Sequence, residues 1–93
     1  MDIEEASALA ATGDADAIYR LGQIHILGEE VEQDIEKAIA YLEQADELDH
    51  PLAPWTLGCF YYNGEFVEKN DSKTLYYWSR SADLGYAPAA LQA

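Results

Sequence analysis

The chain has 93 residues, 49% of them hydrophobic, and its 18 acidic against 5 basic side chains give it a net charge of −13. A chain of this length can bury one small core, and its hydrophobic content is too high for a disordered acidic linker. No run approaches the roughly 18 consecutive apolar residues that a membrane-spanning helix needs.

The N-terminal half predicts three helices in succession. Residues 2–12 are expected to form a helix that ends at the turn of residues 12–14, and residues 16–27 form the next, with apolar side chains recurring every three to four positions. Gly28 can adopt the left-handed conformation that ends a helix. Asp34 then lies where its carboxylate can cap a third helix. The apolar face of that helix consists of Ile35, Ala38, Ile39, Leu42, Ala45 and Leu48.

The C-terminal half repeats the last two helices. Pro51 and Pro54 suit the first turn of a helix that runs to Tyr62, because backbone N–H groups have no intrahelical partner there. Gly64 is expected to end this helix, and Asn70 to cap the next one. The apolar face of the last helix consists of Leu75, Trp78, Ala82 and Leu84.

Residues 17–53 recur 36 positions later with 11 identities over the 37 aligned positions. Such a period is typical of stacked helix pairs. We therefore predict an all-α fold, an α/α superhelix with about two full repeats plus partial terminal repeats. Within a single domain of residues 1–93, we expect a partial repeat helix (1–14), repeat 1 (15–50), repeat 2 (51–86) and the start of a third repeat (87–93).

So few repeats lie near the lower limit for a continuous core. This favours either a piece of a longer array or self-association through the open C-terminal repeat.

The repeated positions carry a resemblance to a known family. The pattern begins with an alanine and a leucine–glycine pair, continues through a glycine loop with valine and an aspartate, and ends with a lysine–alanine pair and an aromatic residue. In the first copy these are Ala17, Leu21-Gly22, Gly28, Val31, Asp34, Lys37-Ala38 and Tyr41. The second copy runs through Ala53, Leu57-Gly58, Gly64, Val67, Asn70, Lys73-Thr74 and Tyr77. With this pattern, the chain resembles the Sel-one-like repeat family, which is related to tetratricopeptide repeats.

Several positions depart from the family pattern. Glu30 and Phe66 stand where the loop usually has a second glycine, which leaves the loop geometry open. Thr74 and Ser81 replace the alanines of the first repeat, so either the packing is looser or a neighbour satisfies their hydroxyl groups. His25 stands where a tyrosine is common, and we expect it to be packed and hydrogen-bonded.

The resemblance implies a binding surface, because in related helical-repeat families the first helix of each unit lines the concave side. The expected partner-binding residues are Asp16, Tyr19, Gln23, Ile26, Leu52, Trp55, Cys59 and Tyr62, and Leu91 would begin a third row. Tyr19 and Trp55 occupy equivalent positions and would stack as neighbouring rungs. They are either binding anchors or part of the core between repeats.

No constellation of residues indicates catalysis, a metal or a cofactor. Cys59 is the only cysteine, so no disulfide can form within the chain, and we expect a thiol that packs between helices. His25 and His50 lack zinc-ligand spacing. The clustered acids lie at helix ends, and phosphate-binding glycine loops are missing. We therefore expect neither an enzyme nor a cofactor.

The negative charge is concentrated in residues 1–50, whose 14 acidic and two basic side chains sum to −12, whereas residues 51–93 sum to −1. This repels phosphates, so we expect no binding to nucleic acid or to anionic membranes. It would attract a basic partner, although solvated helix faces that keep the array soluble would give the same pattern.

Two functions remain. The favoured one is a noncatalytic adaptor or scaffold that binds a peptide or protein segment on the concave helical face. The alternative is an acidic inhibitor or immunity-type protein that masks a basic surface of its partner. The acidic start of the chain does not resemble a secretory signal, so we expect a cytoplasmic location.

The resemblance places Gly22 where the two helices of a unit cross closely, opposite Ala38 and Ala45. Gly22→Leu should therefore lower the free energy of unfolding by well over about 1 kcal/mol, because the added side chain overpacks the crossing. Thermal denaturation measures this, and an unchanged melting temperature would refute the placement.

Overall fold

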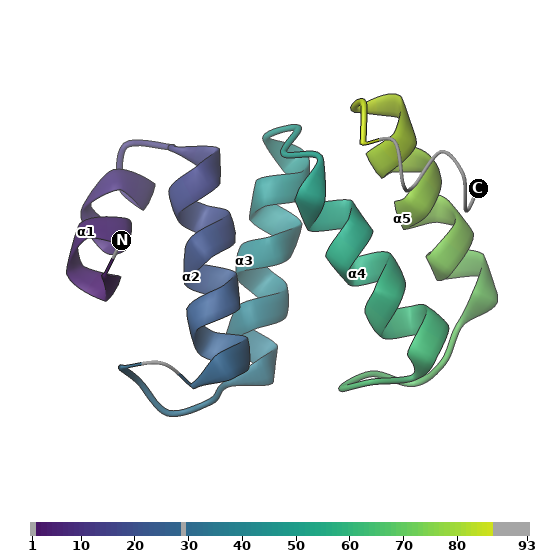
Figure 1. Cartoon of the computed structure of the whole chain (residues 1–93), viewed down its shortest axis with the longest axis horizontal. Coiled ribbons are helices and arrows are strands. Elements are labelled where there is room, and N and C mark those ends of the chain that lie inside the picture. The colour runs from purple at the N-terminus through teal and green to yellow at the C-terminus, as the bar shows by residue number, and fades with distance from the viewer. Residues whose placement is uncertain (1, 29, 87–93) are drawn as a thin grey trace. The chain divides into compact units, whose positions relative to one another are not determined.

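The computed structural model describes residues 2–28 and 30–86, and within them it contains five helices and no strand (Figure 1). The helices are α1 (Ile3–Ala10), α2 (Ala15–Leu27), α3 (Ile35–Glu47), α4 (Leu52–Asn63) and α5 (Asp71–Asp83). The predicted all-α class is confirmed. The predicted start of a third repeat, with Leu91, lies outside the described residues.

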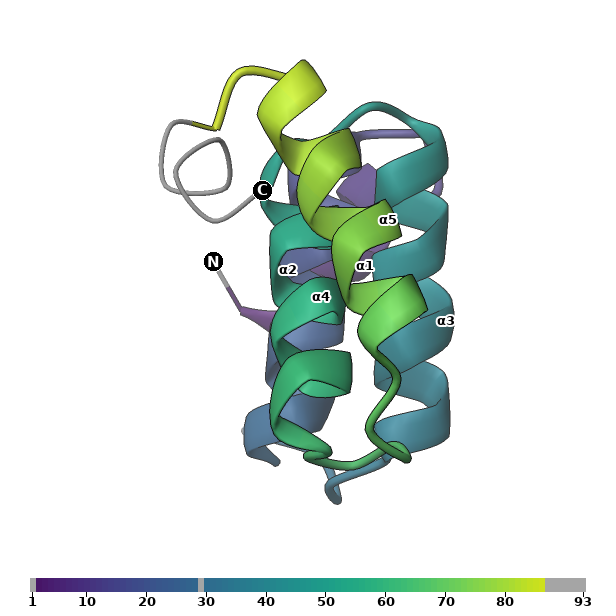
Figure 2. The ribbon, with the colours of Figure 1, turned by 90° about the vertical axis from the view of Figure 1, so that its right-hand side faces the viewer.

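The chain divides into two compact units, Met1–His50 and Pro51–Ala93. In the N-terminal unit α2 packs against both α1 and α3. In the C-terminal unit α4 packs against α5, and Figure 2 shows these two helices side by side. None of the five helices combines the length and the apolar character that a membrane span requires.

Four of the five helices begin with a side-chain cap. Asp2, Asp14, Asp34 and Asn70 each accept a hydrogen bond from the backbone N–H three residues later, at 2.8 to 3.1 Å. The caps predicted at Asp34 and Asn70 are thus confirmed. Helix α4 begins instead at Pro51, which makes no side-chain cap.

The helices α2 and α4 end as predicted, at Gly28 and Gly64, with left-handed φ angles of 72° and 68°. Two residues further on, Glu30 and Phe66 also have positive φ angles, 65° and 68°. They stand where the family usually has a second glycine, and they adopt a left-handed backbone conformation that glycine favours. For a residue with a side chain this conformation costs roughly 1–2 kcal/mol of conformational free energy. Glu30 accepts a hydrogen bond from the Ile3 backbone N–H at 3.2 Å, and the Phe66 ring packs edge-on against a ring of α4.

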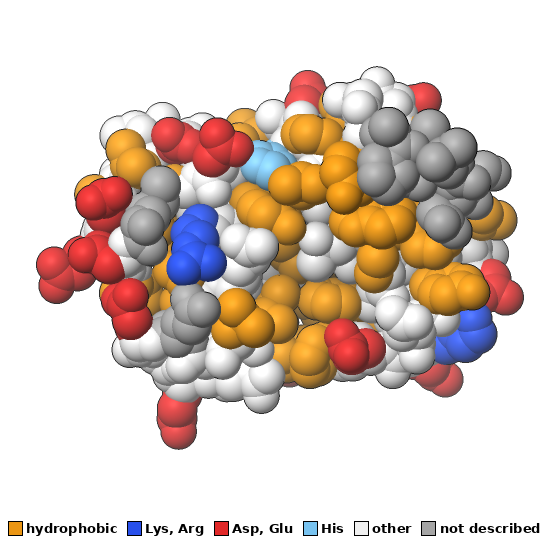
Figure 3. Space-filling model, viewed as in Figure 1, with side chains coloured by type: hydrophobic (Ala, Val, Ile, Leu, Met, Phe, Trp, Pro, Cys, Tyr) orange, Lys and Arg blue, Asp and Glu red, His pale blue; other side chains and the backbone are white. Residues whose placement is uncertain are grey.

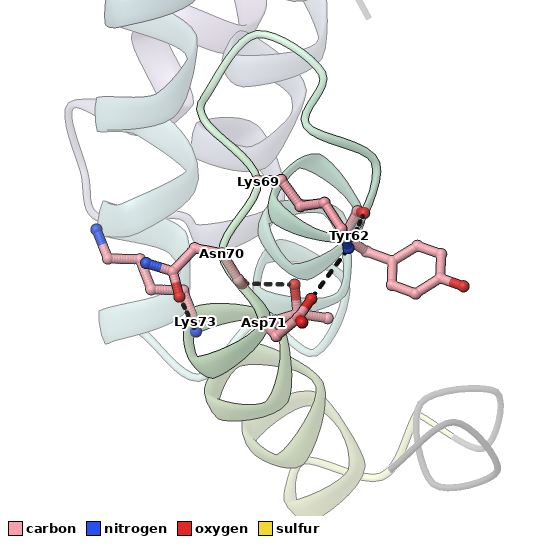
Figure 4. Close-up of polar contacts among 6 residues, drawn as sticks. Tyr62, Lys69, Asn70, Asp71 and Lys73 are labelled. Carbon is pink, nitrogen blue, oxygen red and sulfur yellow. Dashed lines mark hydrogen bonds and ion pairs between the residues drawn. The ribbon is translucent and has the colours of Figure 1, made fainter.

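The loop between α4 and α5 is fastened at both ends (Figure 4). The Lys69 Nζ donates to the Tyr62 carbonyl at 3.2 Å and pairs with the Asp71 carboxylate at 3.0 Å. It also lies 5.1 Å from the centre of the Tyr62 ring, a cation–π distance. Lys69 therefore connects the last turn of α4 with the first turn of α5.

The core of the N-terminal unit lies between its three helices. Ala6 of α1 packs with Leu21 and Ile24 of α2, and the partly buried side chains around this cluster are Ile3, Ala10, Val31 and Tyr41. Gly22 faces α3 as predicted. The nearest atoms opposite it belong to the Leu42 side chain and to the carbonyl of Ala38, one of the two expected alanines. The buried Leu42 side chain therefore lies closest to Gly22 in this crossing.

The two alanine replacements on α5 are buried and hydrogen-bonded. The Ser81 hydroxyl, which is fully buried, donates to the Pro51 carbonyl at 2.6 Å. The Thr74 hydroxyl donates to the Asn70 carbonyl at 2.9 Å. Both hydroxyl groups therefore have a hydrogen-bond acceptor within the C-terminal unit. Of the two alternatives given for these positions, looser packing or a neighbour that satisfies the hydroxyl groups, the second applies.

Among the described glycines, Gly58 leaves the least room for a side chain, because the Trp78 indole packs against it. A Cβ atom built on Gly58 would lie 2.5 Å from the indole Nε1 and closer still to Cδ1. At the equivalent Gly22, the nearest atom would be Leu42 Cδ2 at 3.1 Å. The indole therefore occupies the volume of the absent side chain.

Gly58→Ala should lower the free energy of unfolding by about 1–3 kcal/mol, because the buried indole must move. This loss is net of the gain of about 1 kcal/mol that alanine brings to a helix interior. Gly22→Ala should cost clearly less, since Leu42 needs to move by only a few tenths of an ångström. Urea denaturation of both variants measures the difference, and equal losses would contradict the close contact at Trp78.

Candidate partner-binding surface

The eight residues that the sequence singled out form one stripe on α2 and one on α4. The α2 stripe consists of Asp16, Tyr19, Gln23 and Ile26, and the α4 stripe consists of Leu52, Trp55, Cys59 and Tyr62. None of the eight is buried. The Asp16 side chain is 86% exposed, and Tyr62 is 53% exposed. Each stripe thus presents side chains to solvent beside the core of its own unit.

The α2 stripe is held by a residue that follows α3. The Tyr19 ring stacks on the His50 imidazole, with ring centres 4.7 Å apart and planes 15° apart. His50 Nε2 lies 2.7 Å from Asp16 Oδ1, and since a carboxylate oxygen accepts, the imidazole nitrogen donates. Gln23 Nε2 donates to the Tyr19 hydroxyl at 3.5 Å. His50 therefore orients both the carboxylate and the aromatic ring of this stripe.

The α4 stripe is held by an indole from α5. The Trp55 ring stacks on Trp78 with centres 5.4 Å apart, and the Tyr62 ring lies 5.2 Å from the same indole. Trp78 itself is only 7% exposed. Its position across Gly58 is fixed by packing, so the two aromatic side chains rest on a rigid support. On the face shown in Figure 3, hydrophobic side chains gather over α4.

Sequence analysis missed three residues that build these stripes: His50, Tyr86 and Trp78. From the sequence, His50 stands out only as a possible metal ligand, and Trp78 only as part of an apolar helix face. Tyr86 packs against Trp55 with ring centres 5.3 Å apart, as His50 packs against Tyr19. Tyr86 follows His50 by the repeat period of 36 residues, and this recurrence of a planar ring was the signal that could have revealed both.

Cys59 lies between Trp55 and Tyr62 on α4 and is partly exposed. Burial raises the pKa of its thiol above the ordinary value of 9.0, the Trp78 indole opposes this by donating toward the sulfur, and the Glu65 carboxylate adds to the increase. The indole Nε1 is buried and makes no conventional hydrogen bond to the described residues. Sulfur is a weak acceptor, so Cys59 satisfies this nitrogen only in part.

Two further pairs of rings pack between helices. His25 is buried, its Nδ1 donates to the Leu21 carbonyl at 2.8 Å, and its ring lies 5.5 Å from Tyr41, so the expected packed histidine is confirmed. The Tyr61 and Tyr77 rings stack at 5.9 Å. Within residues 2–28 and 30–86, no three His, Cys, Asp or Glu side chains lie close enough together to hold a metal ion.

Together, the helix pairs and the glycine crossings define a helical-repeat protein. The Sel1 repeat model matches residues 15–50 and 55–86, so the chain belongs to the Sel1 repeat family, as the resemblance predicted. Proteins of this family are mostly noncatalytic scaffolds for protein–protein interaction. No curated protein matches the chain.

Several solved structures are similar to this chain. A Sel1 repeat protein from Oxalobacter formigenes is 30% identical over 95% of this chain, with a TM-score of 0.87. The protein c5321, a protective antigen of uropathogenic Escherichia coli with an SLR fold, is 27% identical over 96% of this chain, with a TM-score of 0.88. Helicobacter pylori cysteine rich protein B is 23% identical over 98% of this chain, with a TM-score of 0.89, a likeness of fold.

The chain is shorter than these relatives. It spans 66% of the Oxalobacter protein, 19% of c5321 and 68% of the Helicobacter protein.

The thiol environment makes a measurable prediction. Because the pKa of Cys59 is raised by folding, iodoacetamide should modify the folded chain more slowly than the urea-unfolded chain between pH 7 and about pH 9, where the thiolate fraction limits the rate. Since the thiol is the stabilised form, the same shift stabilises the fold below the ordinary pKa, and this contribution is lost as pH rises through the higher folded value. Cys59 is the only cysteine, so labelling reports this one site. Equal rates in the folded and unfolded chains would contradict the burial of the thiol.

Proposed function

We propose that this protein is a noncatalytic adaptor that binds a peptide or protein segment through the stripes on α2 and α4. Membership of a family of protein-interaction scaffolds supports a binding role. The stripes are the best candidates for the contact, because they combine exposed polar groups with large aromatic side chains. We also propose a cytoplasmic setting, since a single free cysteine suits a reducing compartment.

The observation that carries the proposal is the support of Trp55 and Tyr62 by the buried Trp78. Aromatic side chains provide much of the binding energy at protein interfaces. The centres of the Trp55 and Tyr62 rings lie 5.4 and 5.2 Å from the centre of the Trp78 ring, which is itself held by packing. A partner that covers them loses little side-chain entropy on binding, and this preorganisation favours affinity.

The α2 stripe is proposed as the equivalent contact in the N-terminal unit. Tyr19 precedes Trp55 by the repeat period of 36 residues and is likewise covered on one side by a ring, that of His50. In related helical-repeat families the first helices line the concave side, and this relationship supports assigning both stripes to the concave helical face. We propose no nucleic-acid or membrane partner for this acidic chain.

The alternative is an acidic inhibitor or immunity-type protein. It is supported by the net charge of −12 over residues 1–50. In that case the partner would present a basic surface, and exposed carboxylates would supply most of the attraction. Self-association through the C-terminal repeat remains a further proposal, which light scattering would test.

Affinity capture from a lysate of the source organism, followed by quantitative mass spectrometry, tests the adaptor function. Combined Tyr19→Ala and Trp55→Ala substitutions should reduce capture of the partner by roughly 30-fold or more, the effect of losing a binding anchor. The matched control is Tyr76→Ala, since Tyr76 is 58% exposed on α5 and belongs to neither stripe. Circular dichroism verifies that all variants are folded.

The result also separates the two functions. Capture that persists above about 0.3 M salt and depends on the aromatic residues supports the adaptor, because salt screens exposed charges over a few ångströms. Capture that collapses at this salt concentration but ignores the aromatic substitutions supports charge masking. Equal losses in the Tyr76→Ala control would show that the stripes are not the binding site.

A further inference from the structure

Four side chains of the N-terminal unit gather around the Tyr19 ring and form the Tyr19 cluster: Asp16, Tyr19, Gln23 and His50. Asp16 and Tyr19 lie three positions apart on α2, so they share one face of the helix. The His50 ring stacks on Tyr19, and its Nε2 lies 2.7 Å from Asp16 Oδ1. All four residues belong to the unit Met1–His50, so one unit builds the whole cluster.

The backbone at the end of α3 fixes the position of His50. The His50 N–H donates to the Ala45 carbonyl at 3.0 Å, and the Asp49 N–H donates to the Asp46 carbonyl at 2.9 Å. Asp49 has a left-handed φ angle of 65°. These two hydrogen bonds and the left-handed residue make up a Schellman motif. Since the His50 side chain is also buried, the imidazole is a rigid support for the groups that it contacts.

The Asp16 carboxylate is oriented and remains open to solvent. Its side chain is 86% exposed, although Oδ1 accepts the hydrogen bond from His50. A hydrogen bond from a neutral imidazole orients a carboxylate without removing its charge. The Tyr19 ring beside it is half-buried, and Gln23 donates to its hydroxyl at 3.5 Å. The cluster therefore presents a negative charge next to a fixed aromatic ring.

A guanidinium group matches this pair of side chains. It is planar, so it can donate two N–H groups to one carboxylate and lie against an aromatic ring. An ammonium group is a compact, strongly hydrated charge and matches the pair less well. The surrounding field also attracts a cation, because residues 1–50 carry a net charge of −12.

We infer that the Tyr19 cluster binds an arginine side chain of the partner, whose guanidinium pairs with Asp16 and lies against the Tyr19 ring. This inference rests on the proposed function and adds to it the residue that the partner presents to the N-terminal unit. Asp16 determines the specificity for arginine, and His50 positions Asp16. The C-terminal unit takes no part in this contact.

A random-peptide library displayed on phage and selected on the immobilised full chain tests the inference. Enriched peptides are sorted by whether Tyr19→Ala weakens their binding, and those that it weakens should contain an arginine. A synthetic copy of the most enriched of them is then titrated by calorimetry. Asp16→Asn removes the charge and keeps an oxygen acceptor for His50, so affinity should fall about fivefold, as for a partly exposed ion pair.

Glu43→Gln is the matched control, because it removes one negative charge from an exposed position of α3 in the same unit. It should change the affinity by less than about twofold, since screening weakens distant exposed charges. These titrations do not depend on the folding of Tyr19→Ala, because both substituted acids are exposed.

Changes in the peptide identify the group that is bound. Norleucine in place of the arginine should abolish the difference between wild type and Asp16→Asn. Lysine in its place should weaken binding about threefold, because an ammonium group lacks the planar pair of donors. Equal affinities of the arginine and lysine peptides would overturn the assignment to a guanidinium.

The outcomes separate the inference from the proposed function. Peptides that need Tyr19 but contain no arginine would overturn the inference alone, and so would a set of peptides that need Trp55 and not Tyr19. Equal losses in Asp16→Asn and Glu43→Gln would do the same, since the charge would then act from the whole surface. No enriched peptide, or only peptides that bind independently of both Tyr19 and Trp55, would overturn the proposed function as well.

Discussion

The C-terminal unit depends on the packing of the Trp78 indole across Gly58. The ring fills the space that a side chain at position 58 would occupy, and this brings α4 and α5 into close contact. The same ring supports Trp55 and Tyr62 on the outer side of α4. Within residues 2–28 and 30–86 its buried Nε1 has only the weak sulfur acceptor of Cys59, so the packing must offset part of the cost of a buried polar group. One contact thus joins the helices and builds the candidate surface.

In the N-terminal unit, different side chains pack against the glycine and support the surface ring. Leu42 packs against Gly22, where an added Cβ atom would be less crowded than at Gly58, and His50 supports the surface ring. Because an imidazole can also donate to a carboxylate, this unit holds Asp16 where the other unit has an apolar side chain. A duplicated backbone plan therefore carries two surfaces of different polarity.

Much of the fold was predictable because its signals are local. The caps at Asp34 and Asn70 and the left-handed ends at Gly28 and Gly64 depend on residues within a few positions. The glycine-like loop conformation of Glu30 was not predictable, because only the closed loop forces a positive φ on it. The candidate site was predicted as two stripes, and the rings that support them were missed.

The sequence by itself determined the helices, their ends and the family, because hydrogen bonds and apolar spacing along a helix involve near neighbours in the chain. Only the tertiary structure decided which buried ring packs against each aromatic side chain of the two stripes. The contacts of Tyr19 with His50 and of Trp55 with Trp78 join side chains from different helices or from the residues that follow them. Such pairs depend on which side chains the packing of two helices brings together, and the side chains opposite the two glycines differ. Equal glycines in the two repeats therefore led to unequal surfaces.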